Sequence, residues 1–137
     1  MKDDSKSQAT KRILVADDHE DIRNLISLIL TTESYEVLVV DSGSELLEKI
    51  SSFNPDLLLL DVMMPHMSGF EVLERVRALP DSHVNSIPIV MITAKSLDAD
   101  VDRAMKLGAS SYIVKPFRAD ALREKVTSQL SQGVLGR

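Results

Sequence analysis

The stretch Asp56-Leu57-Leu58-Leu59-Leu60-Asp61-Val62-Met63-Met64-Pro65 decides the fold of this 137-residue chain. Its four consecutive leucines form a short apolar run without polar alternation, which suits a strand covered on both faces. A strand of this kind lies centrally in a parallel sheet. Because ligands gather beyond the carboxyl ends of such strands, the residue that ends the run, Asp61, is the first candidate for chemistry.

Four more apolar segments of similar length occur at 13–16, 35–40, 87–92 and 112–114. Their β-branched residues are typical of strands, although a short apolar run alone does not separate a strand from a buried helix segment. Helical periodicity flanks the first and last of them. The residues at helical spacing are Ile22, Leu25, Ile26 and Ile29 after the first segment, and Leu122, Val126 and Leu130 after the last.

The three remaining linkers contain signals for helix initiation. Ser42 and Ser68 are each followed three residues later by a glutamate, which is the Ser-x-x-Glu capping box. Ser96 is expected to cap another helix, which Gly108 would end. Five strands that alternate with five helices predict an α/β fold with a five-stranded parallel sheet and helices on both faces.

Length and composition indicate one globular domain, with 44% hydrophobic and 27% charged residues. We expect a folded part at 11–130 between a disordered tail at 1–10 and a frayed tail at 131–137. The net charge of −5 provides no attraction to nucleic acid or anionic lipid, and no apolar run is long enough to span a membrane.

The absence of cysteine excludes disulfides and thiolate sites, and favours the reducing cytoplasm.

Polar residues follow four of the predicted strands. They are Asp17 and Asp18 after the first strand, Asp61 after the third, Thr93 after the fourth and Lys115 after the fifth. Each residue alone has a simpler explanation as a helix cap, a turn residue or a solvated side chain. Together they bring three carboxylates, a hydroxyl and an ammonium to one edge of the sheet.

Three converging carboxylates repel one another unless a cation compensates their charge. Oxygen ligands favour Mg²⁺, whereas His19, His66 and His83 are scattered without zinc-ligand spacing, and we interpret them as surface residues. An ionised aspartate can attack phosphorus while Mg²⁺ and a lysine neutralise the phosphoryl oxygens. The pattern therefore predicts a site for Mg²⁺ and a phosphoryl group.

The segments at the strand ends resemble the receiver domain of two-component response regulators and are similar to the chemotaxis receiver. The similarity extends from about Arg12 to Leu130. The resemblance implies a flavodoxin-like (βα)5 fold with strand order 2-1-3-4-5. The segments that carry it are Ile13-Leu14-Val15-Ala16-Asp17-Asp18, Asp56 to Pro65, Ile92-Thr93-Ala94, Gly108-Ala109 and Tyr112-Ile113-Val114-Lys115-Pro116-Phe117.

The resemblance also implies how the site works. Asp61 would accept a phosphoryl group from a histidine kinase or a histidine phosphotransfer protein. Mg²⁺ would be bound by Asp18, Asp61 and the main-chain carbonyl of Met63, with Asp17 contributing through a water molecule or by contacting one of these ligands. The remaining contacts, all to phosphoryl oxygens, would come from Thr93, Lys115 and the backbone amide of Ala94.

A switch is implied as well. Thr93 would move inward on phosphorylation and Tyr112 would change rotamer, while the Lys115–Pro116 bond would be cis. The surface formed by the helix that Ser96 begins, the strand at 112–114 and the helix that contains Leu122 would then change for partner binding.

The implied role is signalling rather than enzymatic, because the domain would catalyse only its own phosphoryl transfer and dephosphorylation. It would act on a downstream protein partner or an attached output domain, either as a stand-alone regulator or as the receiver part of a larger regulator or hybrid kinase. We expect a monomer or a phosphorylation-dependent dimer, with no nucleic acid or membrane contact by this domain.

Two positions depart from the family pattern. Fast-cycling relatives often have a polar side chain at the position of Met63, and a thioether hydrogen-bonds a hydrolytic water poorly, so we predict slow self-dephosphorylation. Lys95 could either shield the phosphate or contact a partner, and the sequence favours neither.

Two other α/β classes fit the sequence less well. A hydrolase of the haloacid-dehalogenase type needs a second acidic residue two positions after its nucleophile, where this sequence has Met63. A flavin-binding module needs a phosphate loop after the first strand, where Asp17 and Asp18 would repel a phosphate in the absence of metal.

Overall fold

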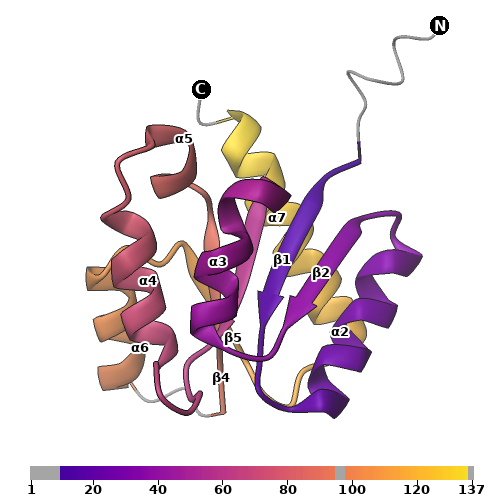
Figure 1. The fold of residues 1–137 in the computed structure, drawn as a ribbon. Helices are drawn as coiled ribbons and strands as arrows, with labels where there is room; N and C mark the ends of the chain where they lie inside the picture. The colour runs from indigo at the N-terminus through magenta and orange to yellow at the C-terminus, as the bar shows by residue number, and fades with distance from the viewer. Residues whose placement is uncertain (1–9, 95–97, 136–137) are drawn as a thin grey trace, which may run out of the picture.

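The computed structural model describes residues 10–94 and 98–135. Most of the expected tail at 1–10 lies outside these ranges, as do Lys95 and the expected helix cap Ser96. Strands and helices alternate along the described chain (Figure 1). The strands are β1 (Arg12–Ala16), β2 (Glu36–Val40), β3 (Leu57–Asp61), β4 (Ile89–Thr93) and β5 (Ser111–Val114). The helices are α2 (Glu20–Thr32), α3 (Gly43–Phe53), α4 (Gly69–Arg77), α5 (Ser82–Asn85), α6 (Asp98–Lys106) and α7 (Ala119–Leu135).

All five strands pair in parallel, in the order β2-β1-β3-β4-β5. This confirms the predicted flavodoxin-like topology, with the leucine run of β3 at the centre of the sheet. The four leucines of that run are fully buried, as a strand covered on both faces requires.

The two faces of the sheet form separate hydrophobic layers, because successive side chains of a strand point to opposite sides. Leu58 and Leu60 pack with residues of α3, α4 and α6 on one face. Leu57 and Leu59 pack with residues of α2 and α7 on the other, and Figure 1 shows these helices on either side of the sheet. Among the described residues, no helix combines the length and apolar character needed to cross a bilayer.

The predicted helix starts are present at α3 and α4. The side chain of Ser42 accepts a hydrogen bond from the Glu45 amide at 3.2 Å, and that of Ser68 accepts one from the Glu71 amide at 3.2 Å. Gly108 follows α6 with a φ of +107°, a conformation that glycine adopts without strain.

Some boundaries differ from those predicted. Strands β2 and β4 begin later than expected, because the amides of Tyr35 and Ile87 donate to Leu30 and Val84 in the preceding turns. Helix α5 was not predicted, since four residues are too few to show a period. Helix α7 extends to Leu135 and so reaches into the segment at 131–137 that was expected to form a frayed tail.

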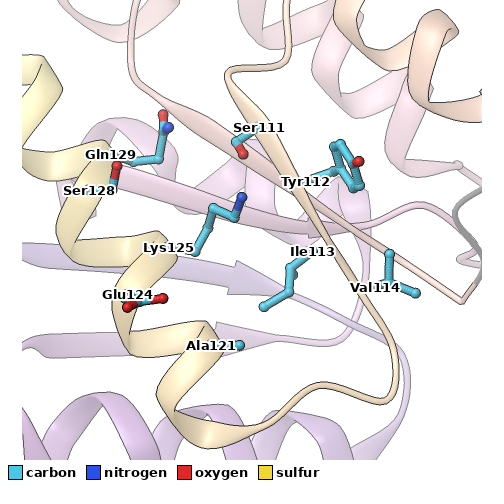
Figure 2. Close-up of a pocket in the computed structure, with 9 residues that line it drawn as sticks. All are labelled: Ser111, Tyr112, Ile113, Val114, Ala121, Glu124, Lys125, Ser128 and Gln129. Carbon is cyan, nitrogen blue, oxygen red and sulfur yellow. The ribbon is translucent and has the colours of Figure 1, made fainter.

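A groove of about 760 Å³ runs along the edge strand β5 beside α7. Figure 2 shows the side chain of Lys125 reaching from α7 toward this strand. The Lys125 ammonium lies 5.8 Å from the centre of the Tyr112 ring, within the range of a cation–π contact. The groove and the half-buried Tyr112 therefore share one surface.

Arg77, the last residue of α4, holds three segments together. Its Nε donates to the Gly108 carbonyl at 2.9 Å, and its Nη1 donates to the carbonyls of Asn85 at 2.9 Å and Ile87 at 2.7 Å. A single guanidinium thus ties α4 to the end of α5 and to the turn after α6.

Replacing Arg77 by methionine should lower the free energy of unfolding by about 2–4 kcal/mol, because three carbonyl groups lose a charged donor. Urea denaturation of the two proteins measures the change. Arg75→Met is the matched control, since Arg75 is exposed and, among the described residues, its side chain pairs only with Glu71, at 3.9 Å. It should alter stability by less than about 0.5 kcal/mol. Equal losses in both variants would contradict the role of Arg77.

Candidate functional site

The carboxyl edge of the sheet gathers the polar residues that follow the strands. Asp17 and Asp18 come directly after β1, Asp61 ends β3 and Thr93 ends β4. Lys115 follows β5. The parallel register sets β3, β4 and β5 side by side, with Asp61 opposite Ile92 and Thr93 opposite Val114. The fold thereby places all five predicted side chains at one edge.

Several of these polar residues are buried. Asp17 is 0%, Asp61 2% and Thr93 6% exposed. An ionised carboxylate is almost never buried without a partner of opposite charge, since leaving water disfavours the charged form. Two buried aspartates at one sheet edge therefore indicate a site rather than a packing arrangement.

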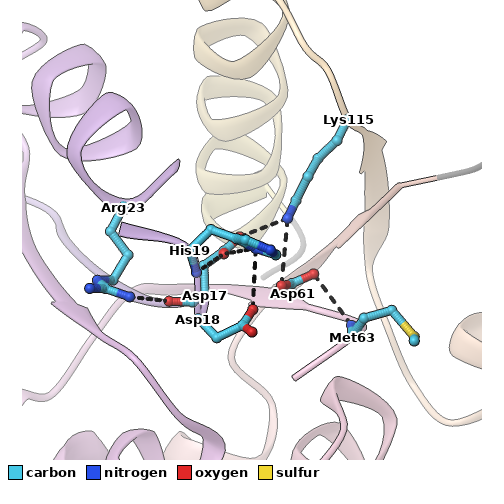
Figure 3. A network of polar contacts seen from close by, with 7 residues as sticks. All are labelled: Asp17, Asp18, His19, Arg23, Asp61, Met63 and Lys115. Carbon is cyan, nitrogen blue, oxygen red and sulfur yellow. Dashed lines mark hydrogen bonds and ion pairs between the residues drawn. The ribbon is translucent and has the colours of Figure 1, made fainter. Parts of the chain in front are cut away.

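Lys115 supplies part of the missing charge. Its ammonium lies 3.1 Å from Asp17 Oδ2 and 3.5 Å from Asp61 Oδ2, so that it bridges the two buried carboxylates (Figure 3). The Lys115–Pro116 peptide that follows is cis. The predicted convergence of Asp17, Asp61 and Lys115 is present in the structure.

Backbone contacts fix the carboxylates in place. The His19 amide donates to Asp17 Oδ1 at 2.9 Å, and the Met63 amide donates to Asp61 Oδ1 at 3.3 Å. Arg23, on the first turn of α2, donates to the Asp17 carbonyl at 2.9 Å. Arg23 was not singled out in the sequence, where an arginine on a helix gives no sign of such a contact.

The pKa of Asp61 is raised from its ordinary value of 3.8 to about 7. Burial is the main cause, and the neighbouring charge of Asp17 raises the pKa further. Lys115 and the Met63 amide act in the opposite direction but do not overcome these effects. In the absence of a cation the site therefore favours a protonated Asp61 at acidic pH.

Three carboxylate oxygens are buried without any hydrogen-bond donor: Asp17 Oδ2, Asp18 Oδ1 and Asp61 Oδ2. These oxygens form ion pairs with Lys115 or His19, but they accept no hydrogen bond from the described residues. One ligand atom from each aspartate lies within 4.8 Å of the others, and oxygen donors at this spacing fit a hard divalent cation. The residues present thus suit the cation predicted for the site.

His19 is exposed, as predicted for a surface residue, but it also lies in the same cluster as the aspartates, a spacing that was not predicted. Its Nδ1 lies 3.3 Å from Asp17 Oδ1 and 3.3 Å from Asp18 Oδ1. His66 and His83 are exposed, as predicted. The sequence signal that could have placed His19 in the cluster is its position directly after Asp17 and Asp18.

Gly69 is a second residue that the sequence did not single out. A side chain there would collide with the main-chain carbonyl of Asp61, because the first turn of α4 packs directly against the end of β3. Its amide also donates to the Val62 carbonyl at 2.9 Å. A glycine at the start of a predicted helix was the only sign of this close approach.

Comparison with known proteins identifies the family. The sequence model of the response regulator receiver domain matches residues 13–127. The chain belongs to this family. A receiver domain is a signalling domain, and two-component phosphorelay signalling is the family's general function.

Two curated relatives illustrate the similarity of this receiver domain. The DNA-binding response regulator MtrA of Mycolicibacterium smegmatis is 38% identical over 120 residues, which cover 88% of this chain and 50% of the relative. The regulatory protein VanR of Enterococcus faecium is 37% identical over 119 residues, which cover 87% and 49%. The chain therefore spans about half the length of these relatives.

Solved structures of receiver domains have the same fold as this chain. The chemotaxis protein CheY4 of Vibrio cholerae superposes on the receiver domain with a TM-score of 0.83 and 32% identity, covering 88% of this chain and 98% of CheY4. A CheY-like receiver domain from Methanospirillum hungatei gives a TM-score of 0.86 and 30% identity, covering 94% and 100%.

Without metal, the receiver domain should lose stability as the pH rises from about 4 to about 7, by at most about 4 kcal/mol from Asp61. In this range folded Asp61 keeps a proton that the unfolded chain has released, so each rise in pH favours unfolding. Urea denaturation in EDTA across this pH range measures the slope. Asp61→Asn should flatten it and stabilise the protein near neutral pH, and parallel curves for the two proteins would contradict the raised pKa.

Proposed function

We propose that this receiver domain accepts a phosphoryl group on Asp61 from the phosphohistidine of a histidine kinase or a histidine phosphotransfer protein. The observation that carries the proposal is the buried Asp61 carboxylate, with the Lys115 ammonium at 3.5 Å and unpaired carboxylate oxygens beside it. A nucleophilic carboxylate, a fixed ammonium and oxygen ligands for a divalent cation are the elements that phosphoryl transfer needs.

In the proposed transfer, an oxygen of ionised Asp61 forms a bond to phosphorus as the bond from phosphorus to the donor's histidine nitrogen breaks. Lys115 would leave Asp17 partly unpaired and stabilise negative charge on the phosphoryl oxygens. Mg²⁺, held by Asp18, Asp61 and the Met63 carbonyl with Asp17 nearby, would neutralise further charge when bound. The same cation would favour the ionised form of Asp61.

Thr93 and the backbone amide of Ala94 are proposed to bind the phosphoryl oxygens. Thr93 ends the strand next to Asp61, and Ala94 follows it at the exposed rim of the sheet. A hydroxyl and an amide at this edge are donors that a newly formed dianion would attract.

The proposed output is a change in the surface of α6, β5 and α7. Tyr112 lies on β5, opposite Met91, and packs partly against the core layer that contains Leu60. Inward movement of Thr93 would open space that the Tyr112 ring could enter. The charge of a phosphoryl group on Asp61 would thereby favour one of two positions of this ring. The groove beside β5 lies on this surface, where a downstream protein or an attached output domain would bind.

The proposed setting is the cytoplasm, whose reducing conditions suit a chain without cysteine. MtrA is named as a DNA-binding protein, but the net charge of −5 here gives this receiver domain no attraction to nucleic acid. We propose that it works as a monomer or as a phosphorylation-dependent dimer, through protein contacts.

Incubation with Mg²⁺ and acetyl phosphate should add one phosphoryl mass to the intact protein, measured by mass spectrometry. The adduct should require Mg²⁺ and be absent in Asp61→Asn, because this amide cannot act as the nucleophile. Asp102→Asn removes an exposed carboxylate from α6 and should leave the adduct unchanged. An Asp61→Asn protein that still gained the Mg²⁺-dependent mass would refute the assignment.

The phosphorylated protein should lose its phosphoryl group slowly, and Met63→Asn should make this loss several times faster. The Met63 side chain is 71% exposed beside the Asp61 carboxylate, where a thioether offers a hydrolytic water little hydrogen bonding. The decay of the adduct after removal of the phosphodonor gives the rate. Met105→Asn, at another exposed methionine, is the control, and an unchanged rate in Met63→Asn would contradict the prediction.

A further inference from the structure

His19 is placed at the start of a helix but does not cap it. It occupies the N-cap position of α2 with extended backbone angles, and its side chain makes no capping hydrogen bond. Serine, threonine, aspartate and asparagine are the usual residues at this position because their side chains bond to free helix amides. The imidazole is instead directed at the carboxylates of Asp17 and Asp18 (Figure 3).

The spacing of the imidazole nitrogen suits metal coordination. Nδ1 of His19 lies 3.3 Å from an oxygen of Asp17 and 3.3 Å from an oxygen of Asp18. Neighbouring ligands of an octahedral ion are about 3.0 Å apart when metal–ligand bonds are about 2.1 Å long. The complete set, with one atom from Asp61, spans at most 4.8 Å, slightly more than the roughly 4.2 Å between opposite ligands.

In the described part of the chain, the other cationic side chains near the cluster do not contact the carboxylate of Asp18. Lys115 faces Asp17 Oδ2 and Asp61 Oδ2, and Arg23 bonds to the Asp17 main chain. Among the described residues, the buried Asp18 Oδ1 has no hydrogen-bond donor and forms an ion pair with His19 alone. The side chain of His19 is 62% exposed, so the ring is free to turn toward an ion that enters from solvent.

We propose that His19 supplies an imidazole nitrogen to the divalent cation of this site and gives it a preference for transition-metal ions over Mg²⁺. The inference rests on the proposed function, since the cation is the one that serves Asp61. Nitrogen ligands strengthen the binding of ions such as Co²⁺ and Mn²⁺ much more than that of Mg²⁺, which prefers oxygen. His19 would therefore determine metal specificity without being a catalytic residue.

An alternative role for His19, in which it does not bind the metal, predicts a different result. If the imidazole only hydrogen-bonded to the carboxylate of Asp17, every cation alike would have to displace this contact. Its removal would then strengthen the binding of Mg²⁺ and Co²⁺ together. A nitrogen ligand, in contrast, changes the ratio of the two affinities.

The test compares untagged wild-type protein with His19→Gln at about pH 8, where free imidazole is neutral. Calorimetric titrations give the affinities for Co²⁺ and Mg²⁺. The substitution should weaken Co²⁺ binding by at least about tenfold and change Mg²⁺ binding by less than about twofold. The matched control is His83→Gln, because His83 is exposed on α5 and outside the cluster, and it should change neither affinity.

Pulsed electron paramagnetic resonance of bound Mn²⁺ provides a direct readout. The wild type and His83→Gln should show coupling to an imidazole nitrogen, and His19→Gln should not. Absence of this coupling in the wild type, an unchanged ratio of Co²⁺ to Mg²⁺ affinity, or stronger binding of both ions to His19→Gln would each overturn the inference.

The proposed function is judged separately, by the Mg²⁺-dependent phosphoryl adduct on Asp61. If His19→Gln forms the adduct with Mg²⁺ while its Co²⁺ affinity falls, both proposals hold. If the adduct forms but no nitrogen coupling is seen, only the role of His19 fails. If the wild type shows the coupling but takes up no phosphoryl group, the metal site stands and the phosphoacceptor role fails.

Discussion

Repulsion among three carboxylates at one sheet edge is the constraint on which the site depends. The hydrophobic layers on both sides of β3 hold the sheet together, and its parallel register keeps Asp17 and Asp61 buried beside each other at one edge. Lys115 offsets only part of their negative charge. The stability gained by burying the leucines of β3 therefore maintains an arrangement that is unfavourable by itself, and a cation bound there would offset much of the repulsion.

Much of the fold was predictable because the sequence is locally consistent. The leucine run is too uniformly apolar for a surface strand, and both Ser-x-x-Glu segments begin helices as their capping chemistry predicts. The topology places residues that follow different strands at one edge, so the convergence of Asp17, Asp61 and Lys115 also followed from the pattern. Family membership, shown by comparison, agrees with this reading.

What the sequence did not reveal depends on contacts between distant segments or on single side-chain directions. The collision that a side chain at Gly69 would cause with Asp61 is a matter of how closely a helix approaches a strand end. Arg77 contacts three carbonyls that lie in two later turns, and no local pattern encodes them. His19 was overlooked because ligand spacing was sought among the histidines rather than between a histidine and the adjacent aspartates.

The guanidinium of Arg77 also limits how α6 can move. It holds the Gly108 carbonyl, just beyond the carboxyl end of α6, while the amino end of the helix lies on the side of Thr93. A helix that is held at one end can rotate about that end, but it cannot shift along its own axis. A displacement that begins near Thr93 would therefore pivot α6 about its carboxyl end, and the amplitude would be greatest at the end nearest Asp61.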